Sequence, residues 1–228
     1  MSRLLVLCVL PACVGGSDDS SNPKFESLAD IVDLSVNQAS ATVDAGGLYL
    51  DTDDGDNAAG GFNGTGTGNK SIAGFPGWDG LWLGALSGLA VETTSTEGGS
   101  TPYFNLVLDM DGTGCDYKVI VAETTLATAS AVGDGMRYSY AAGSAQWKAV
   151  GGLDDILPGH LESTGGALSD VIAAYPGAVL ADADTGDNGL PAGVETTSLM
   201  LILGDSLNHT ALGHTVSAVE VSGDRYVP

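Results

Sequence analysis

Basic side chains are scarce in this chain. Its 228 residues include 7 Lys and Arg against 29 Asp and Glu, which gives a formal net charge of −22. Proteins that bind DNA or RNA place clusters of Lys and Arg against the phosphates, so this composition argues against a nucleic-acid partner. An acidic surface suits hydration or the attraction of divalent cations, and a plain solvated surface is the simpler interpretation.

Cysteine and histidine are equally scarce, with three of each. Cys8 lies inside an N-terminal apolar run and Cys13 follows that run, so Cys115 alone remains for the folded domain if the run is removed. One thiol cannot form an intramolecular disulfide, and the acidic residues around Cys115 disfavour its thiolate form. The histidines show no HExxH spacing, which argues against a zinc site.

Long apolar runs are missing as well. No stretch of the sequence reaches the roughly 18 apolar residues that a transmembrane helix needs. A shorter uninterrupted run, residues 4–10, follows Arg3 and precedes Pro11, Ala12 and Cys13. A basic residue, an apolar run and a small residue occur in this order in secretory signals.

With a cysteine directly after the small residue, this segment resembles the lipobox of bacterial lipoproteins, in which the cysteine is acylated before cleavage. The resemblance implies a signal peptide over residues 1–12, a lipid on Cys13 and a polar, Gly- and Ser-rich tether over residues 13–22. It also implies anchoring to the cell envelope. Val14 is not the aspartate that retains lipoproteins in the inner membrane, which favours the outer membrane or the cell surface. A plain secretory signal or a short buried strand are the alternatives.

Glycine, by contrast, is abundant, with 34 residues. Short apolar stretches separated by glycine- and aspartate-rich turns indicate many strands and few helices. The clearest unit is a β-hairpin over residues 102–123, in which apolar residues alternate on both sides of a turn at residues 109–114. Because both faces of this hairpin are partly apolar, we expect it to lie in the middle of its sheet.

One helix is expected, capped by Ser163 or Thr164 and ending before Pro176. Its apolar residues at helical spacing are Leu168, Val171, Ile172 and Tyr175. Further strands are expected at residues 48–50, 178–180, 198–203, 215–221 and 225–227, and core residues at Leu81, Trp82, Leu83 and Leu86. We therefore predict one domain over residues 23–228, an all-β, jelly-roll-like β-sandwich with one short helix and long Gly- and Asp-rich loops.

The turn of the hairpin is the best candidate metal site, with Asp109, Asp111, Thr113 and Asp116 as ligands. Alternating carboxylates on a glycine turn can direct several oxygens at one cation, and calcium takes about six to eight oxygen ligands. The pattern resembles the Asp-rich turns of secreted calcium-binding repeats, which implies a structural calcium. The alternative is a plain turn in which Asp and Gly supply the backbone angles.

Aromatic residues make up 6% of the chain, and three of them suit a sugar-binding face. Trp78 lies in a Pro-Gly-Trp-Asp-Gly turn, and Tyr138 and Tyr140 occupy alternate positions of an expected strand, so they share one face. Exposed aromatic rings can stack on pyranose rings, and these three residues are the predicted ligand contacts. The alternative is that they belong to the core.

Residues 203–207 read Leu-Gly-Asp-Ser-Leu, which resembles the block of GDSL-type esterases and lipases, with Ser206 in the position of the nucleophile. That family places an Asp-x-x-His block downstream of its serine, and no such block follows Ser206 here. We interpret these letters as the end of a strand and a turn, and assign no catalytic residue.

In its pattern, the segment 80–228 resembles jelly-roll modules of exported bacterial surface proteins. The resemblance implies binding or adhesion without catalysis. We therefore expect a lipid-anchored envelope protein that binds a glycan or another envelope protein, with calcium as its expected cofactor. The alternatives are a carbohydrate-active hydrolase or lyase and a purely structural envelope protein.

Overall fold

The structure is a computed structural model that describes residues 25–35, 39–52, 70–96, 101–114, 116–122, 124–149, 165–183, 197–204 and 212–228. Cys13 and the expected signal and tether lie outside these residues. Within the described ranges, no helix has the length and apolar character needed to cross a membrane.

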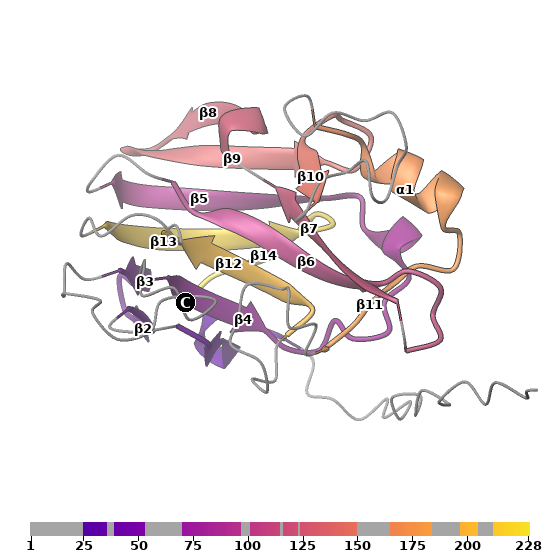
Figure 1. The fold of residues 1–228 in the computed structure, drawn as a ribbon. Coiled ribbons are helices and arrows are strands. Elements are labelled where there is room, and N and C mark those ends of the chain that lie inside the picture. Colours follow the sequence, from indigo (N-terminus) through magenta and orange to yellow (C-terminus); the bar gives the residue numbers. More distant parts are fainter. Residues whose placement is uncertain are drawn as a thin grey trace, which may run out of the picture.

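Two antiparallel sheets pack face to face and form a β-sandwich (Figure 1). The first contains β1 (Val32–Asp33), β4 (Ser71–Phe75), β6 (Tyr103–Asp109), β7 (Tyr117–Ala122), β10 (Trp147–Ala149), β11 (Val179–Leu180) and β12 (Leu199–Leu203). The second contains β2 (Ser40–Asp44), β3 (Gly47–Asp51), β5 (Gly88–Thr96), β8 (Thr128–Val132), β9 (Gly135–Ala141), β13 (Gly213–Val221) and β14 (Asp224–Tyr226). The single described α-helix is α1 (Leu168–Ala174), and 3-10 turns lie at η1 (Leu28–Asp30), η3 (Leu83–Ala85) and η4 (Thr124–Leu126).

The chain crosses between the sheets in the order of a jelly roll. The first sheet runs β1-β4-β12-β6-β7-β10 and the second β2-β3-β13-β5-β9-β8. The connections from β3 to β4, β5 to β6, β7 to β8 and β12 to β13 each pass from one sheet to the other. The late strands β12 and β13 thus insert between strands formed much earlier in the chain, as in a double Greek key. The predicted jelly-roll-like all-β class is confirmed.

The β6–β7 hairpin is paired as its alternating pattern predicts. Its register runs from Phe104 opposite Ala122 to Asp109 opposite Tyr117, and β6 pairs on its other side with β12. Both strands therefore lie inside the sheet, with β10 next to β7. This arrangement fixes the turn after Asp109 at one end of the sandwich.

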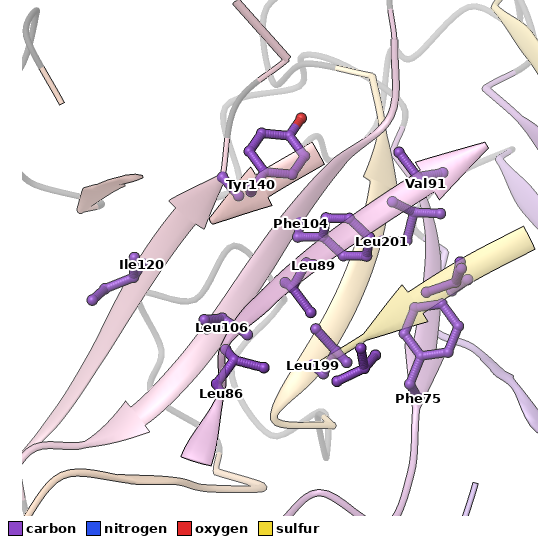
Figure 2. Close-up of a cluster of buried hydrophobic side chains, with 14 of the residues drawn as sticks. Phe75, Leu86, Leu89, Val91, Phe104, Leu106, Ile120, Tyr140, Leu199 and Leu201 are labelled. Atoms are coloured by element: carbon purple, nitrogen blue, oxygen red, sulfur yellow. The ribbon is translucent and has the colours of Figure 1, made fainter. Parts of the chain in front are cut away.

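The core lies between the two sheets and is built from alternate residues of both. Figure 2 shows Leu89, Val91 and Tyr140 of the second sheet gathered in one cluster with Phe104 and Leu201 of the first. The rings of Phe104 and Tyr140 meet edge to face, with centroids 5.9 Å apart. Such contacts between facing layers stabilise a sandwich through buried apolar area.

The predicted helix exists, but the prediction of its cap is wrong. The N-cap of α1 is Ala167, which has no side-chain oxygen to accept a hydrogen bond from the helix, and Ser163 and Thr164 lie outside the described residues. Leu168 and Val171 are buried, as their spacing predicts. Packing of this apolar face, rather than a cap, therefore holds the helix in place.

Candidate functional site

Three connections meet at the end of the sandwich where α1 and β11 lie (Figure 1). They are residues 76–87 between β4 and β5, residues 110–116 between β6 and β7, and residues 175–178 between α1 and β11. We call this region the Trp82 end. It contains the Asp109 turn and two tryptophans, Trp78, which was predicted as a ligand contact, and Trp82, which was predicted as a core residue.

The carboxylate of Asp109 holds the Asp109 turn in shape. Asp109 itself is only 4% exposed. Its Oδ1 accepts hydrogen bonds from the backbone N–H groups of Asp111 (3.3 Å) and Gly112 (3.0 Å), and its Oδ2 accepts one from Gly114 (2.6 Å). Gly112 and Gly114 both have positive φ, which explains the glycines at these two positions. Asp109 therefore acts inside the turn, as an acceptor for backbone donors.

The Asp111 carboxylate lies on the outside of the same turn. Its Oδ1 accepts hydrogen bonds from the Oγ1 of Thr113 at 2.7 Å and from the backbone N–H of Thr113 at 3.0 Å. These bonds lower the pKa of Asp111, so it stays ionised. Asp116 is also exposed, and its backbone carbonyl accepts from Met110 at 2.8 Å.

The four predicted calcium ligands thus lie on one turn. Within the described residues, no three His, Cys, Asp or Glu side chains come together in a group that could hold a metal ion. The hydrogen bonds of Asp109 and Asp111 account for the shape of the turn in the way that Asp and Gly commonly shape turns. Calcium at this turn stays a prediction.

Trp82 is the most exposed large aromatic residue among those described, with 50% of its surface open to solvent. Its indole Nε1 donates a hydrogen bond to the backbone oxygen of Pro176 at 3.0 Å. A Cβ built on Gly84 would overlap the six-membered ring of Trp82, so the glycine backbone lies directly against that ring. The ring is therefore fixed in place and at the same time accessible.

The Asp109 turn and Trp82 are joined through residues 176–177. A Cβ on Gly112 would lie 3.2 Å from the carbonyl oxygen of Gly177, and one on Gly177 would lie 3.4 Å from the carbonyl oxygen of Asp111. The two backbones are therefore in close approach. Since Pro176 also accepts the Trp82 indole N–H, one short connection touches both features.

Two further carboxylates border this end. Asp79 accepts a hydrogen bond from the backbone N–H of Asp182 at 2.8 Å, and Asp182 accepts one from that of Ser198 at 2.6 Å. Burial raises the pKa of Asp182, with a smaller contribution from the nearby charge of Asp79. Burial also raises the pKa of Tyr117, and the charges of Asp109 and Asp79 add to this shift. The exposed carboxylates at the Trp82 end are those of Asp79, Asp111 and Asp116.

The three aromatic residues predicted to contact a ligand have other positions. The prediction that Tyr140 is exposed is wrong, because it is 1% exposed and packs between Phe104 and Trp147. Tyr138 is half-buried and packs against the core. Trp78 is also half-buried, and its ring meets Tyr226 edge to face with centroids 6.3 Å apart.

Trp82 was missed because it stands in the apolar stretch of residues 81–86 and was assigned to the core. Leu83 and Leu86 of that stretch are buried, as predicted, whereas Trp82 is turned outward. The chain enters the 3-10 turn η3 directly after Trp82, so the neighbouring side chains of this stretch do not all face the core. The glycine two residues later is the only local signal of the ring's position.

The GDSL-like letters fall at the end of β12. Gly204 follows the strand, and its carbonyl accepts a hydrogen bond from the hydroxyl of Tyr103 at 3.4 Å. Asp205, Ser206 and His209 lie outside the described residues. His214 is fully buried on β13, opposite Leu50 of β3.

Comparison of the chain with models of protein families, with curated proteins and with solved structures gives no significant match to any of them.

Proposed function

We propose that this protein is an exported, lipid-anchored envelope protein whose β-sandwich binds a glycan at the Trp82 end without catalysis. The N-terminal order of Arg3, an apolar run, Ala12 and Cys13 supports export and anchoring. The jelly-roll sandwich supports a rigid domain that presents loops at its ends.

The observation that carries the binding proposal is the fixed, half-exposed ring of Trp82. One side of the indole is covered by the backbone at Gly84, and its N–H is held by Pro176, so little side-chain freedom is left to lose on binding. The apolar C–H face of a pyranose can stack on such a ring. The carboxylates of Asp79 and Asp111 lie on the same end and can accept hydrogen bonds from sugar hydroxyls.

Gly84→Ala tests this proposal without removing any aromatic ring. Its Cβ would displace the Trp82 ring, so we expect binding to an array of cello-, chito- and manno-oligosaccharides to fall by about tenfold or more, as after Trp82→Ala. The matched control is Gly143→Ala, because a Cβ there meets no atom within 4 Å and Gly143 does not have positive φ.

Gly84→Ala and Trp82→Ala are expected to melt close to the wild-type temperature, because Trp82 is exposed and Gly84 is only half-buried. Binding that is unchanged in Trp82→Ala would remove Trp82 from the proposal. A wild-type chain that binds no sugar of the array would favour a purely structural envelope protein, and release of shortened sugars would favour a hydrolase or lyase.

Calcium at the Asp109 turn is tested by separating the roles of the buried carboxylate of Asp109 and the exposed carboxylate of Asp111. Asp109→Ala leaves three backbone donors without their acceptor, so we expect a loss of about 2 kcal/mol with or without EDTA. Asp111→Asn leaves Asp109 in place and removes an exposed charge. We expect EDTA to lower the melting temperature of the wild type and not that of Asp111→Asn. An unchanged wild-type melting temperature in EDTA would rule out a structural calcium.

A further inference from the structure

The edge strand β8 differs from the other strands that end the two sheets. β1 has two residues and includes Asp33, and β10 has three and includes Lys148. β2 is covered from the first sheet, where the Ser71 hydroxyl donates to the Ser40 carbonyl at 2.5 Å. β8 reads Thr-Ala-Ser-Ala-Val, with no charge, no proline and no interruption of its register with β9, and all five residues are exposed. It lacks the features that normally prevent edge strands from pairing.

The turn between β8 and β9 shows which backbone groups point away from the sheet. Gly133, with φ of +55°, and Asp134 form a two-residue loop that pairs Val132 with Gly135. In an antiparallel hairpin the hydrogen-bonded pairs alternate, so Val132, Ser130 and Thr128 bond to β9. The N–H and C=O groups of Ala129 and Ala131 therefore face outward, and none of them has a partner among the described residues.

This pattern is complementary to itself. If two copies of β8 run antiparallel about a two-fold axis at Ser130, Ala129 of each lies opposite Ala131 of the other, and four backbone hydrogen bonds form. The side chains of Ala129, Ser130 and Ala131 at the centre of the junction are methyl and hydroxymethyl groups, and no side chain of β8 is charged, so little keeps the strands apart. We propose that two copies of this protein associate through β8, which joins their second sheets into one continuous sheet.

Pairing of one five-residue strand from each copy buries much less than the roughly 800 Å² per partner of a typical stable interface. Each copy also carries a net charge of −22, which opposes association at low salt. We therefore expect a weak dimer in solution that strengthens with salt. Anchoring in a shared membrane, which rests on the proposed function, would favour the dimer further by raising the local concentration of the copies.

Cysteine cross-linking tests the predicted register in the full chain, with Cys8, Cys13 and Cys115 replaced by serine. Ser130→Cys places two thiols at the two-fold axis, in a pair without backbone hydrogen bonds, where the Cα separation suits a disulfide. We expect Ser130→Cys to give disulfide-linked dimers in about tenfold higher yield than Thr128→Cys, the control on the same face of the same strand. Mixing Thr128→Cys with Val132→Cys should restore cross-linking, because these positions lie opposite each other across the axis.

Sedimentation of the wild-type chain in high salt provides a second readout. Ala131→Lys adds a charge at an exposed position and is expected to weaken association by about tenfold or more, with an unchanged melting temperature. Equal cross-linking of Ser130→Cys and Thr128→Cys would overturn the proposal. So would a wild-type chain that stays monomeric at millimolar concentration, which would leave β8 for a strand of a different protein.

Discussion

Replacing Glu92 by alanine is expected to lower the free energy of unfolding by about 2 kcal/mol, because two arginines lose the buried carboxylate that they share. Glu92 Oε1 accepts a hydrogen bond from Arg137 Nη1 at 3.0 Å, and Oε2 accepts one from Arg225 Nη2 at 2.6 Å. Arg137 also binds Glu220 at 2.7 Å. The Glu92 side chain is only 9% exposed, whereas that of Arg225 is 49% exposed, so water can replace part of the Arg225 contact and less of the Arg137 contact.

This network joins four adjacent strands of the second sheet, namely β14, β13, β5 and β9. The control is Glu220→Ala. Glu220 has one arginine partner, and its side chain is 26% exposed, so we expect a loss of less than about 1 kcal/mol. Urea unfolding of the two variants measures both values. Equal losses for Glu92→Ala and Glu220→Ala would contradict the view that Glu92 is the centre of the network.

The same network predicts a pH dependence. Hydrogen bonds from Arg225 and, to a smaller extent, from Arg137 lower the pKa of Glu92 below its ordinary value, while burial opposes the shift. Because the folded state then binds the proton less well than the unfolded state, the stabilisation is complete above about pH 4.3 and is lost as the pH falls through the folded pKa. Glu92→Gln removes this titration. We therefore expect its stability to fall less steeply than that of the wild type below that pH.

The parts of the fold that were predicted from the sequence are those whose determinants are local. The β6–β7 hairpin has both strands and its turn within residues 102–123, and alternation alone defines it. The helical face of Leu168 and Val171 is likewise local, whereas the cap was misplaced because no capping side chain is used. β12 and β13 were recognised as strands, but their positions between earlier strands follow from pairings across the chain that no local pattern encodes.

In the candidate site, too, the sequence predicted features with local determinants and not those that depend on contacts between distant residues. The Asp109 turn was predicted from its own letters, although the buried role of Asp109 as a backbone acceptor was not. Trp82 is held by a carbonyl 94 residues away, at Pro176, and nothing in the sequence near Trp82 indicates that contact. Glu92 likewise meets Arg225 across 133 residues. Alternation predicted that Tyr138 and Tyr140 share a face, but it could not tell which face of β9 is turned to the core.

Tyr140 lies on the face of β9 that is turned to the core, and the last prediction depends on this position. Tyr140→Ala is expected to lower the free energy of unfolding by about 4 kcal/mol, since it removes a fully buried ring that packs on Phe104 at 5.9 Å and on Trp147 at 6.1 Å. Figure 2 shows this ring next to Phe104 in the cluster of buried side chains. Tyr140→Phe keeps the ring and should retain most of the stability. Thermal or urea unfolding measures both variants.

Measuring sugar binding distinguishes two hypotheses for Tyr140, namely that it packs in the core or that it contacts a ligand together with Tyr138. Under conditions in which the Tyr140→Phe variant is folded, we expect its affinity for an oligosaccharide of the array to equal that of the wild type. The Trp82→Ala variant should lose affinity at nearly full stability. A Tyr140→Phe variant that stays folded but loses sugar binding would place the ligand near β9 and would contradict the proposed site at the Trp82 end. If the sandwich is a scaffold and its loop end is the binding site, substitutions at Tyr140 change stability, whereas substitutions at Trp82 change sugar binding.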